Sequence, residues 1–569
     1  MLSLLAYGGS LWATRIFDDS HSVFQNPALR EGASIRRLFE DVGAFSVYNA
    51  SGHYRPVTLT SYAVTFRLFG ESDIAFHAGN LLIHVTCVAA LYALLLALLP
   101  ALNEKGRAEV PAAVGAAVFG IHPAASQVVH YISSRSESLA LAGILGALAL
   151  HAYSAKATSG RQRLLLRGLQ FLSVAFALGS KESGVIVLPL LVALDLALEP
   201  RPLAGIGRRI GRLAAPTVLV AIYFVLQLLP GLGRFLSESA ATGGAASARP
   251  DWTVDSLSAL WVYLGIFAFP AKLAFWRELP PEASAAFPAT LAALLLVGSI
   301  GLATVLLLLG RKRAMALAFL FFFFPFVPYL LRPLYLVVNE NRLYPSLLGL
   351  AIGAALFYAR FYRNWLNSGG TRRIVALSIG LALMAGAIAR DWSASYVWAS
   401  EIRAWRNAVA VSPHSGVIRA GIGTALMREQ RWSEATEQFM ESLLMNPDQS
   451  AAIHDNIGIC AYQQGDVETA HRYFLNAHAL NPNSIEILNN LGSVLHELGR
   501  PEDALPYLDR AAELSPGYCE PRIEALMVAR TMDDAGSLRD RLLSLPPHCL
   551  TDHRIPELRR WLEDTAVDN

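Results

Sequence analysis

The chain has 569 residues, of which 54% are hydrophobic and only 16% are charged. This balance is too apolar for a soluble protein of that size and indicates a chain with several membrane-spanning helices. The formal net charge of +2 favours neither a nucleic acid nor an acidic partner. The four cysteines lack the C-x-x-C spacing of metal sites, although Cys519 and Cys549 could pair in an oxidising compartment.

Apolar runs fill residues 1–391, which we expect to form an all-α, polytopic membrane domain. A helix needs about 20 apolar residues to cross a bilayer. The segment 257–275 is also apolar, but Pro270, Lys272 and Arg277 interrupt it. The candidate spans are 1–14, 77–100, 109–122, 137–156, 166–180, 183–199, 213–231, 289–310, 314–331, 343–361 and 374–391.

The basic residues predict an orientation, because positively charged linkers stay in the cytoplasm. Such linkers lie at 156–167, 201–212, 311–313 and 360–373. They share one side only if 257–275 does not cross completely, so we interpret that segment as re-entrant or lying on the surface. The prediction is eleven spans with a cytoplasmic N-terminus. The C-terminal part would then face the periplasm of a bacterial inner membrane, or the lumen of the endoplasmic reticulum.

The first outer loop, residues 15–76, begins with two adjacent carboxylates. Asp18 and Asp19 directly follow the first span. A carboxylate there could act as a general base, because deprotonating an alcohol requires a positioned acceptor. Neighbouring side chains project in different directions, so we expect only one of the two to address a substrate. The alternative is that both residues cap a helix that begins near Ser20.

Charged residues also gather at the outer ends of other predicted spans. Arginine binds phosphate through paired hydrogen bonds and lysine binds it as a point charge, so these residues could hold a lipid-linked phosphate. The alternatives are snorkelling to lipid headgroups and structural Arg–Glu pairing. Histidines occur nearby without carboxylates at metal-binding spacing, so we expect no metal site. The charged residues are Arg55, Arg135, Glu137, Lys181, Glu182, Glu340 and Arg342, and the histidines are His77, His84, His122 and His130.

The chain changes character near Arg390 and then repeats. Residues 392–413 are expected to form a linker and a half-repeat that includes Trp405. Small residues and a closing proline at this period are typical of tetratricopeptide repeats, in which helix pairs stack into a solenoid. We therefore predict three repeats over 414–516 and a helical cap over 517–569. The period of 34 or 35 residues is carried by Pro413, Pro447, Pro482 and Pro516, by Gly423, Gly458 and Gly492, and by Ala435, Ala470 and Ala504.

Two asparagines, Asn456 and Asn490, occupy equivalent positions in the first helices of successive repeats. Those helices line the concave face of such arrays. Asparagine can hydrogen-bond an extended peptide backbone without reading its side chains, so we expect the pair to bind an acceptor protein. The alternative is that both are ordinary polar residues on a solvated face.

Taken in order, these segments resemble the TMTC-type (transmembrane and tetratricopeptide repeat) O-mannosyltransferase family of the GT-C superfamily. The likeness extends over nearly the whole chain, although three full repeats are fewer than many members carry. It rests on the stretches Phe17–Ser20 with Asn26-Pro27, Tyr54–Thr58, Asn80–His84, His122-Pro123, Ile132–Arg135, Ser180–Glu182 and Glu340–Ser346.

The resemblance implies transfer of a sugar, usually mannose, from a polyprenyl- or dolichyl-phosphate donor to Ser or Thr of a protein on the non-cytoplasmic side. It implies that Asp18 is the base and Asp19 the supporting carboxylate. No cofactor beyond the donor, and no divalent metal, is expected. The donor phosphate would be held by Arg55, Arg135, Lys181 and Arg342, with Glu182, His122 and Glu340 in support.

One physical observation agrees with a lipid-linked donor. Nucleotide sugars are cytoplasmic, and the chain has no phosphate-binding glycine loop. Two other hypotheses stay open. The chain could be a non-enzymatic membrane scaffold whose repeats hold a partner, or a GT-C enzyme that acts on a lipid or glycan.

Overall fold

The computed structural model describes residues 1–30, 32, 34–40, 54–102, 104, 107–199, 206–228, 252–279, 286–330, 338–445 and 450–567. Within these ranges the protein is helical, and the only extended pairing is an isolated bridge between Arg277 and Val338. This confirms the all-α fold class. The chain divides into two compact units, Met1–Ser412 and Pro413–Asn569.

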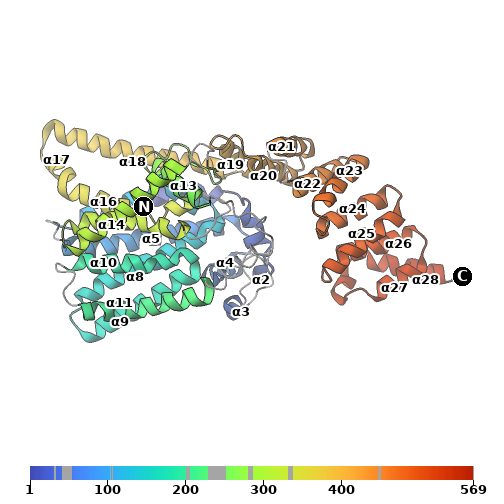
Figure 1. The fold of residues 1–569 in the computed structure, drawn as a ribbon, viewed down its shortest axis with the longest axis horizontal. Coiled ribbons are helices and arrows are strands. Elements are labelled where there is room, and N and C mark those ends of the chain that lie inside the picture. The colour runs from blue at the N-terminus through green and yellow to red at the C-terminus, as the bar shows by residue number, and fades with distance from the viewer. Residues whose placement is uncertain are drawn as a thin grey trace. The chain divides into compact units, whose positions relative to one another are not determined.

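The first unit is a stack of apolar helices, and Figure 1 shows α5, α8, α9 and α11 running side by side. In chain order its helices are α1 (Leu2–Tyr7), η1 (Gly8–Trp12), η2 (Ser20–Phe24), α2 (Pro27–Arg30), α3 (Ile35–Glu40), α4 (Pro56–Phe69), α5 (Asp73–Ala101), α6 (Glu109–Gly120), η4 (Pro123–Ala125), α7 (Ser126–His130), η5 (Ile132–Ser134), α8 (Arg135–Lys156), α9 (Gly160–Ser180), η6 (Glu182–Ile186), α10 (Val187–Leu198), α11 (Ile206–Tyr223), η7 (Phe224–Leu228), α13 (Trp252–Ala268), α14 (Ala286–Leu308), α15 (Arg313–Phe323), η9 (Phe324–Leu330), η10 (Glu340–Leu343), α16 (Leu347–Phe357), η11 (Tyr358–Tyr362), α17 (Arg363–Asn367), α18 (Gly370–Trp398) and α19 (Glu401–Val409).

Five helices in the described part are long and apolar enough to cross a membrane, and a sixth results if a pair bent by 52° counts as one span. The predicted count of eleven is therefore not confirmed. Several predicted spans form shorter helices: α10 has 12 residues, or about 18 Å, against a hydrocarbon core of about 30 Å. The five are Asp73–Ala101, Ile132–Lys156, Ile206–Leu226, Ala289–Leu308 and Gly370–Trp398, and the bent pair is Glu109–Gly120 with Pro123–His130.

Small residues let the apolar helices of this unit approach closely. A Cβ added at Gly143 of α8 would lie 2.8 Å from the backbone nitrogen of Ala177 in α9, so only glycine fits at that crossing. Close backbone approach of this kind is how membrane helices gain packing energy in the absence of water. The α8–α9 pair in turn brings the N-terminal end of α8 close to the segment that follows α9.

The second unit is built from the expected helix pairs. Gly423 and Gly458 show why the period exists: a Cβ at either position would lie 2.7 Å and 2.6 Å from the rings of Phe439 and Phe474. Each glycine thus admits the aromatic side chain of the second helix of its own repeat. The pairs are α20 (Gly416–Arg428) with α21 (Trp432–Met445), α22 (Ser450–Gln463) with α23 (Val467–Leu480), and α24 (Ile485–Glu497) with α25 (Pro501–Leu514).

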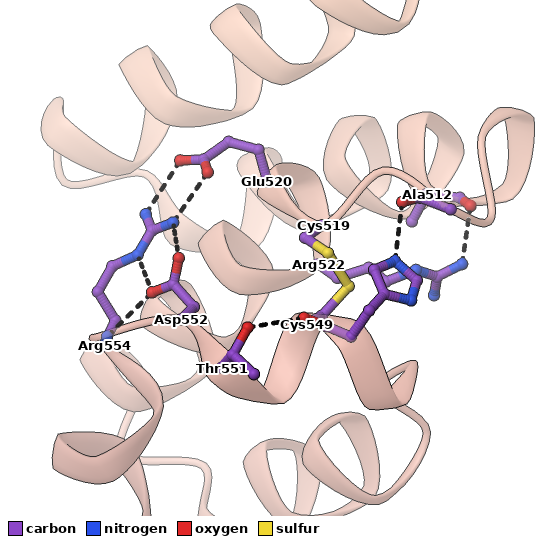
Figure 2. The surroundings of a disulfide bond; sticks show 10 residues. Ala512, Cys519, Glu520, Arg522, Cys549, Thr551, Asp552 and Arg554 are labelled. Atoms are coloured by element: carbon purple, nitrogen blue, oxygen red, sulfur yellow. Dashed lines mark hydrogen bonds and ion pairs between the residues drawn. A yellow bond between two sulfur atoms is a disulfide. The ribbon is translucent and has the colours of Figure 1, made fainter. Parts of the chain in front are cut away.

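The C-terminal cap consists of α26 (Glu520–Thr531), α27 (Ala535–Leu543), η12 (Pro547–Thr551) and α28 (Ile555–Val567). A disulfide joins Cys519 to Cys549, whose Cα atoms are 5.4 Å apart (Figure 2). Beside it, Arg554 pairs with Glu520 at 2.8 Å and with Asp552 at 2.9 Å. Covalent and ionic links therefore fasten η12 and the following turn to the start of α26.

The disulfide should stabilise the cap measurably. It closes a loop of 30 residues, for which loop-closure entropy predicts about 3–4 kcal/mol. In the Cys519→Ser/Cys549→Ser double variant, thermal unfolding of the repeats should occur at a lower temperature. Dithiothreitol should lower the unfolding temperature of the parent protein but leave that of the double variant unchanged. Equal unfolding temperatures for the two proteins without reductant would contradict this prediction.

Candidate active site

The loop after η1 carries both adjacent carboxylates, and Asp19 is the buried one. Its side chain is 0% exposed. It accepts hydrogen bonds from the Ile16 nitrogen at 3.1 Å, the Ser133 nitrogen at 2.8 Å and the Ser133 hydroxyl at 2.6 Å. Asp19 therefore ties the N-terminal loop to the residues just before α8. It precedes the turn Ser20–Phe24 but makes no side-chain capping bond to it, which argues against the capping alternative for this residue.

Asp18 is the accessible carboxylate of the pair, with a side chain 42% exposed. Its Oδ1 lies 3.1 Å from Nε2 of His21, and its backbone nitrogen donates to the Tyr131 hydroxyl at 3.1 Å. The two neighbours thus point in different directions, as expected for consecutive residues. Of the two carboxylates, Asp18 is the one that molecules outside the protein can reach.

The environment of Asp19 alters its ionisation. Burial raises the pKa of Asp19 to about 7, against hydrogen bonds from Ser133 and Ile16 that lower it. The charge of Asp18 raises this pKa further. All three groups around Asp19 donate hydrogens, so the ionised form is the one that fits the geometry.

The first turn of α8 joins this loop to a second polar cluster. Glu137, whose side chain is 1% exposed, lies 2.7 Å from Nζ of Lys181. It also accepts a hydrogen bond from the Tyr329 hydroxyl at 3.1 Å. The neighbouring Glu182 forms a two-nitrogen contact with Arg55, its shortest distance being 2.8 Å. We call Arg55, Glu137, Lys181, Glu182 and Tyr329 the cation cluster.

Arg342 borders the cation cluster. Its guanidinium carbon lies 4.9 Å from the centre of the Tyr329 ring, and its Nη1 donates to the Tyr263 hydroxyl at 3.3 Å. Burial lowers the pKa of Lys181, and the charge of Glu137 opposes that effect. The structure thus brings together Arg55, Lys181 and Arg342, three of the four residues predicted to hold a donor phosphate.

Arg135 points elsewhere. It is 1% exposed, and its guanidinium donates to the Asn80 side chain at 2.7 Å, the Phe76 carbonyl at 2.7 Å and the Thr65 hydroxyl at 3.1 Å. Each of its three nitrogens therefore has a protein acceptor. In this arrangement Arg135 fastens α8 to α4 and α5, and phosphate binding by its guanidinium stays a prediction.

The expected supporting residues Glu340 and His122 contact other segments. Glu340 accepts from the Ala274 nitrogen and from Arg277, both at 2.9 Å. Burial raises the pKa of Glu340 to about 7, against the lowering effect of Arg277. His122 Nδ1 accepts from the Ala124 nitrogen at 3.2 Å, which fixes the turn into η4. Their supporting roles stay predictions.

Sequence reasoning did not single out Tyr329, Tyr131 or His21. Tyr329 lies at the end of an apolar run, where an aromatic residue is unremarkable. Tyr131 belongs to a short segment between two helices, and His21 follows the carboxylates by two or three positions. Only the spacing of His21, which is typical of a neighbour on one helical turn, could have indicated its contact with Asp18.

In the repeats, Asn456 and Asn490 are both partly exposed on α22 and α24. The Asn490 amide donates to Asp455 at 2.9 Å, so it links these two helices. Burial raises the pKa of Asp455 to about 6, while the hydrogen bond from Asn490 lowers it. Acceptor binding by the two asparagines stays a prediction.

Comparison with protein families gives a match within the second unit. Residues 456–518 match the family model described as tetratricopeptide repeat. This agrees with the period and the helix pairs of the second unit.

The similarity to full-length proteins covers both units. Protein O-mannosyl-transferase F38B6.6 of Caenorhabditis elegans is 22% identical over 460 residues, which are 78% of this chain and 62% of that protein. Protein O-mannosyl-transferase TMTC1 of Homo sapiens is 24% identical over 513 residues, 80% of this chain and 55% of that protein. Protein O-mannosyl-transferase TMTC3 of Mus musculus is 21% identical over 532 residues, 84% of this chain and 54% of that protein.

The chain thus spans between 54% and 62% of the length of these curated relatives. Because 78% or more of this chain is covered, the similarity exceeds the first unit, Met1–Ser412, and reaches into the second. The predicted resemblance is confirmed, because the chain is similar to several protein O-mannosyl-transferases, TMTC1 and TMTC3 among them, at 21–24% identity over 78–84% of its length.

Proposed function

We propose that this protein is a membrane glycosyltransferase that moves a sugar, with mannose the leading candidate, from a polyprenyl- or dolichyl-phosphate donor to Ser or Thr hydroxyls of proteins. One observation carries the proposal: an accessible carboxylate, Asp18, sits on a loop that Asp19 fastens to the start of α8, from which Glu137 holds the cation cluster. A base and a group of cations that are both fastened to the start of one helix suit transfer from a phosphate leaving group.

In the proposed reaction, Asp18 accepts the proton of the acceptor hydroxyl as its oxygen attacks the anomeric carbon. The bond between that carbon and the phosphate oxygen breaks, and the electron pair leaves with the lipid phosphate. Arg55, Lys181 and Arg342 would stabilise the negative charge that develops there. Attack opposite the leaving group inverts the configuration of the sugar.

The carboxylates of the cation cluster have a separate task. Buried cations are costly without a counter-charge, and Glu137 and Glu182 supply it. A donor phosphate would take over part of that role when it binds. Glu137 and Glu182 also limit the net positive charge of the cation cluster. The site would therefore favour a phosphate monoester or diester over a highly charged nucleotide.

The side of the membrane is part of the proposal. A disulfide persists in oxidising compartments and is rare in the cytosol. The Cys519–Cys549 bond therefore supports placing the repeats in the periplasm or the lumen, as does the distribution of basic linkers. Repeats on that side could hold an acceptor protein, with Asn456 and Asn490 on the helices that face it.

Purified protein incubated with polyprenyl-phosphate mannose and candidate acceptor proteins should produce acceptors heavier by one hexose, measured by intact mass. Transfer to a lipid or glycan with no protein product would favour the alternative GT-C reaction. Removing residues 414–569 separates these further, because a glycan enzyme would keep its rate whereas a protein-modifying enzyme would lose its acceptor. Donor that stays intact with every acceptor class would favour a scaffold.

The rate of transfer should depend on the ionisation of Asp19. Because its pKa is about 7, Asp19 carries a proton at lower pH and then fits poorly among three donors. The rate should therefore rise between about pH 6 and pH 8 as this proton is lost. In Asp19→Asn the residual rate should lose that rise. A rise of the same size in Asp19→Asn would assign it to another group.

A further inference from the structure

We infer that helix α19 positions the segment Phe17–Asp19, called the catalytic loop below, with Glu401 and Trp405 as the positioning residues. The inference rests on the proposed function, because it concerns the placement of Asp18. Helix α19 (Glu401–Val409) is the last helix of the first unit, and the first repeat helix begins soon after it, at Gly416.

The residue before Asp18 has an unusual backbone. Phe17 has a φ of +45°, in the left-handed region that non-glycine residues rarely adopt. Such a conformation persists only where the surroundings hold it. Asp18 follows directly, so the torsion at Phe17 decides the direction in which the Asp18 carboxylate leaves the loop.

Helix α19 and Trp276, which lies between α13 and α14, supply the groups that hold Phe17. The Phe17 nitrogen donates to Oε1 of Glu401 at 3.2 Å. The Phe17 ring lies edge-on against Trp405 and Trp276, with ring centres 5.7 Å apart in both cases. Glu401 and Trp405 are four residues apart on the helix, so both address the same residue from one face.

Trp405 is itself rigidly placed. It is 1% exposed and packs against Phe275 with ring centres 4.6 Å apart. The segment that carries Phe275 is fastened from both sides, since Asn407 donates to the Leu273 carbonyl at 2.6 Å and Arg390 donates to the Pro270 carbonyl at 3.1 Å. The indole is therefore a fixed surface against which the Phe17 ring rests.

Phe17, Asp18 and Asp19 are thus held from two sides, by the segment that leads into α8 and by α19 together with Trp276. Asp19 bonds Ser133, and the Asp18 nitrogen bonds Tyr131, so those anchors come from the segment that leads into α8. Phe17 is held from α19. Without the second anchor, Phe17 can relax to a negative φ while Asp19 stays bound, and the Asp18 carboxylate then turns away from the acceptor.

The test uses the full-length protein in the transferase assay. Glu401→Ala should lower kcat about tenfold and Trp405→Ala about a hundredfold, with the KM for polyprenyl-phosphate mannose unchanged, because a misplacement of about 1 Å can cost that much. Glu401→Gln should restore most of the rate, since its amide oxygen still accepts from the Phe17 nitrogen. Trp405→Phe should be intermediate. Arg406→Ala, on the exposed face of the same helix, is the matched control.

A second measurement needs no substrate. Hydrogen exchange of the Phe17 amide should be faster in Glu401→Ala than in the parent or Glu401→Gln, while exchange at residues 132–137 stays the same. Unchanged kcat and unchanged exchange in Glu401→Ala would overturn the inference. In Glu401→Ala, a lower unfolding temperature together with a changed KM for the donor and a lower kcat would also overturn it, because that pattern belongs to a purely structural residue. A parent protein that exchanges as expected but transfers no sugar would contradict the proposed function and leave the anchor established.

Discussion

Asp18→Asn should abolish sugar transfer without affecting membrane insertion. Asparagine has the shape of aspartate but cannot accept the hydroxyl proton, and a positioned general base contributes about 10²- to 10⁴-fold to rate. The side chain is 42% exposed, so its replacement should leave stability unchanged. Transfer measured by intact mass of the acceptor, together with donor binding and the unfolding temperature, separates the loss of chemistry from loss of fold.

Asp73→Asn is a suitable control for this experiment. Asp73 is another partly exposed carboxylate near the same loop, where it pairs with Arg15 at 2.6 Å. Exposed pairs of this kind contribute about 1 kcal/mol or less to stability, so the control should transfer at nearly the parent rate. Equal transfer by Asp18→Asn and the parent would remove Asp18 from the mechanism.

Lys181→Met should both destabilise the protein and stop transfer. Glu137 is almost fully buried and lies 2.7 Å from the Lys181 ammonium. Removing one partner of a buried ion pair costs about 3–5 kcal/mol, because the other charge is left uncompensated. Methionine keeps most of the volume of lysine, so the expected drop in unfolding temperature reflects the charge and not a cavity.

The double variant Lys181→Met/Glu137→Gln distinguishes stability from function. With both charges removed, and with glutamine still able to accept from Tyr329, most of the lost stability should return. Transfer should not return, because the cation that faces the donor phosphate is still missing. A stable double variant with the parent rate would show that Lys181 only balances Glu137.

The repeats were predictable because their signal is local. Glycine, alanine and proline recur at fixed spacing, since each repeat buries the same ring against the same small residue, as in Gly458 and Phe474. The number of spans was less predictable. Hydropathy marks apolar runs, but it does not show where a run breaks into short helices, as at α10.

The candidate site was predictable only in outline. Position in a predicted outer segment indicates the side of the membrane, which is why Arg55, Lys181 and Arg342 were expected on one face. It does not indicate the direction in which a side chain leaves its helix. The contacts of Arg135 with α4 and α5, away from the cation cluster, were therefore not predicted. The left-handed backbone at Phe17 could not be predicted from the sequence, because the residue is not a glycine.

The four-residue spacing of Glu401 and Trp405 has a consequence for how such proteins can vary in length. One residue inserted between them would rotate Trp405 by about 100° around the helix and remove it from Phe17. The helical turn at 401–405 therefore has a fixed register. Repeats added or lost beyond Ser515 would leave that register unchanged. The number of repeats can therefore change while Glu401 and Trp405 keep their contacts with Phe17.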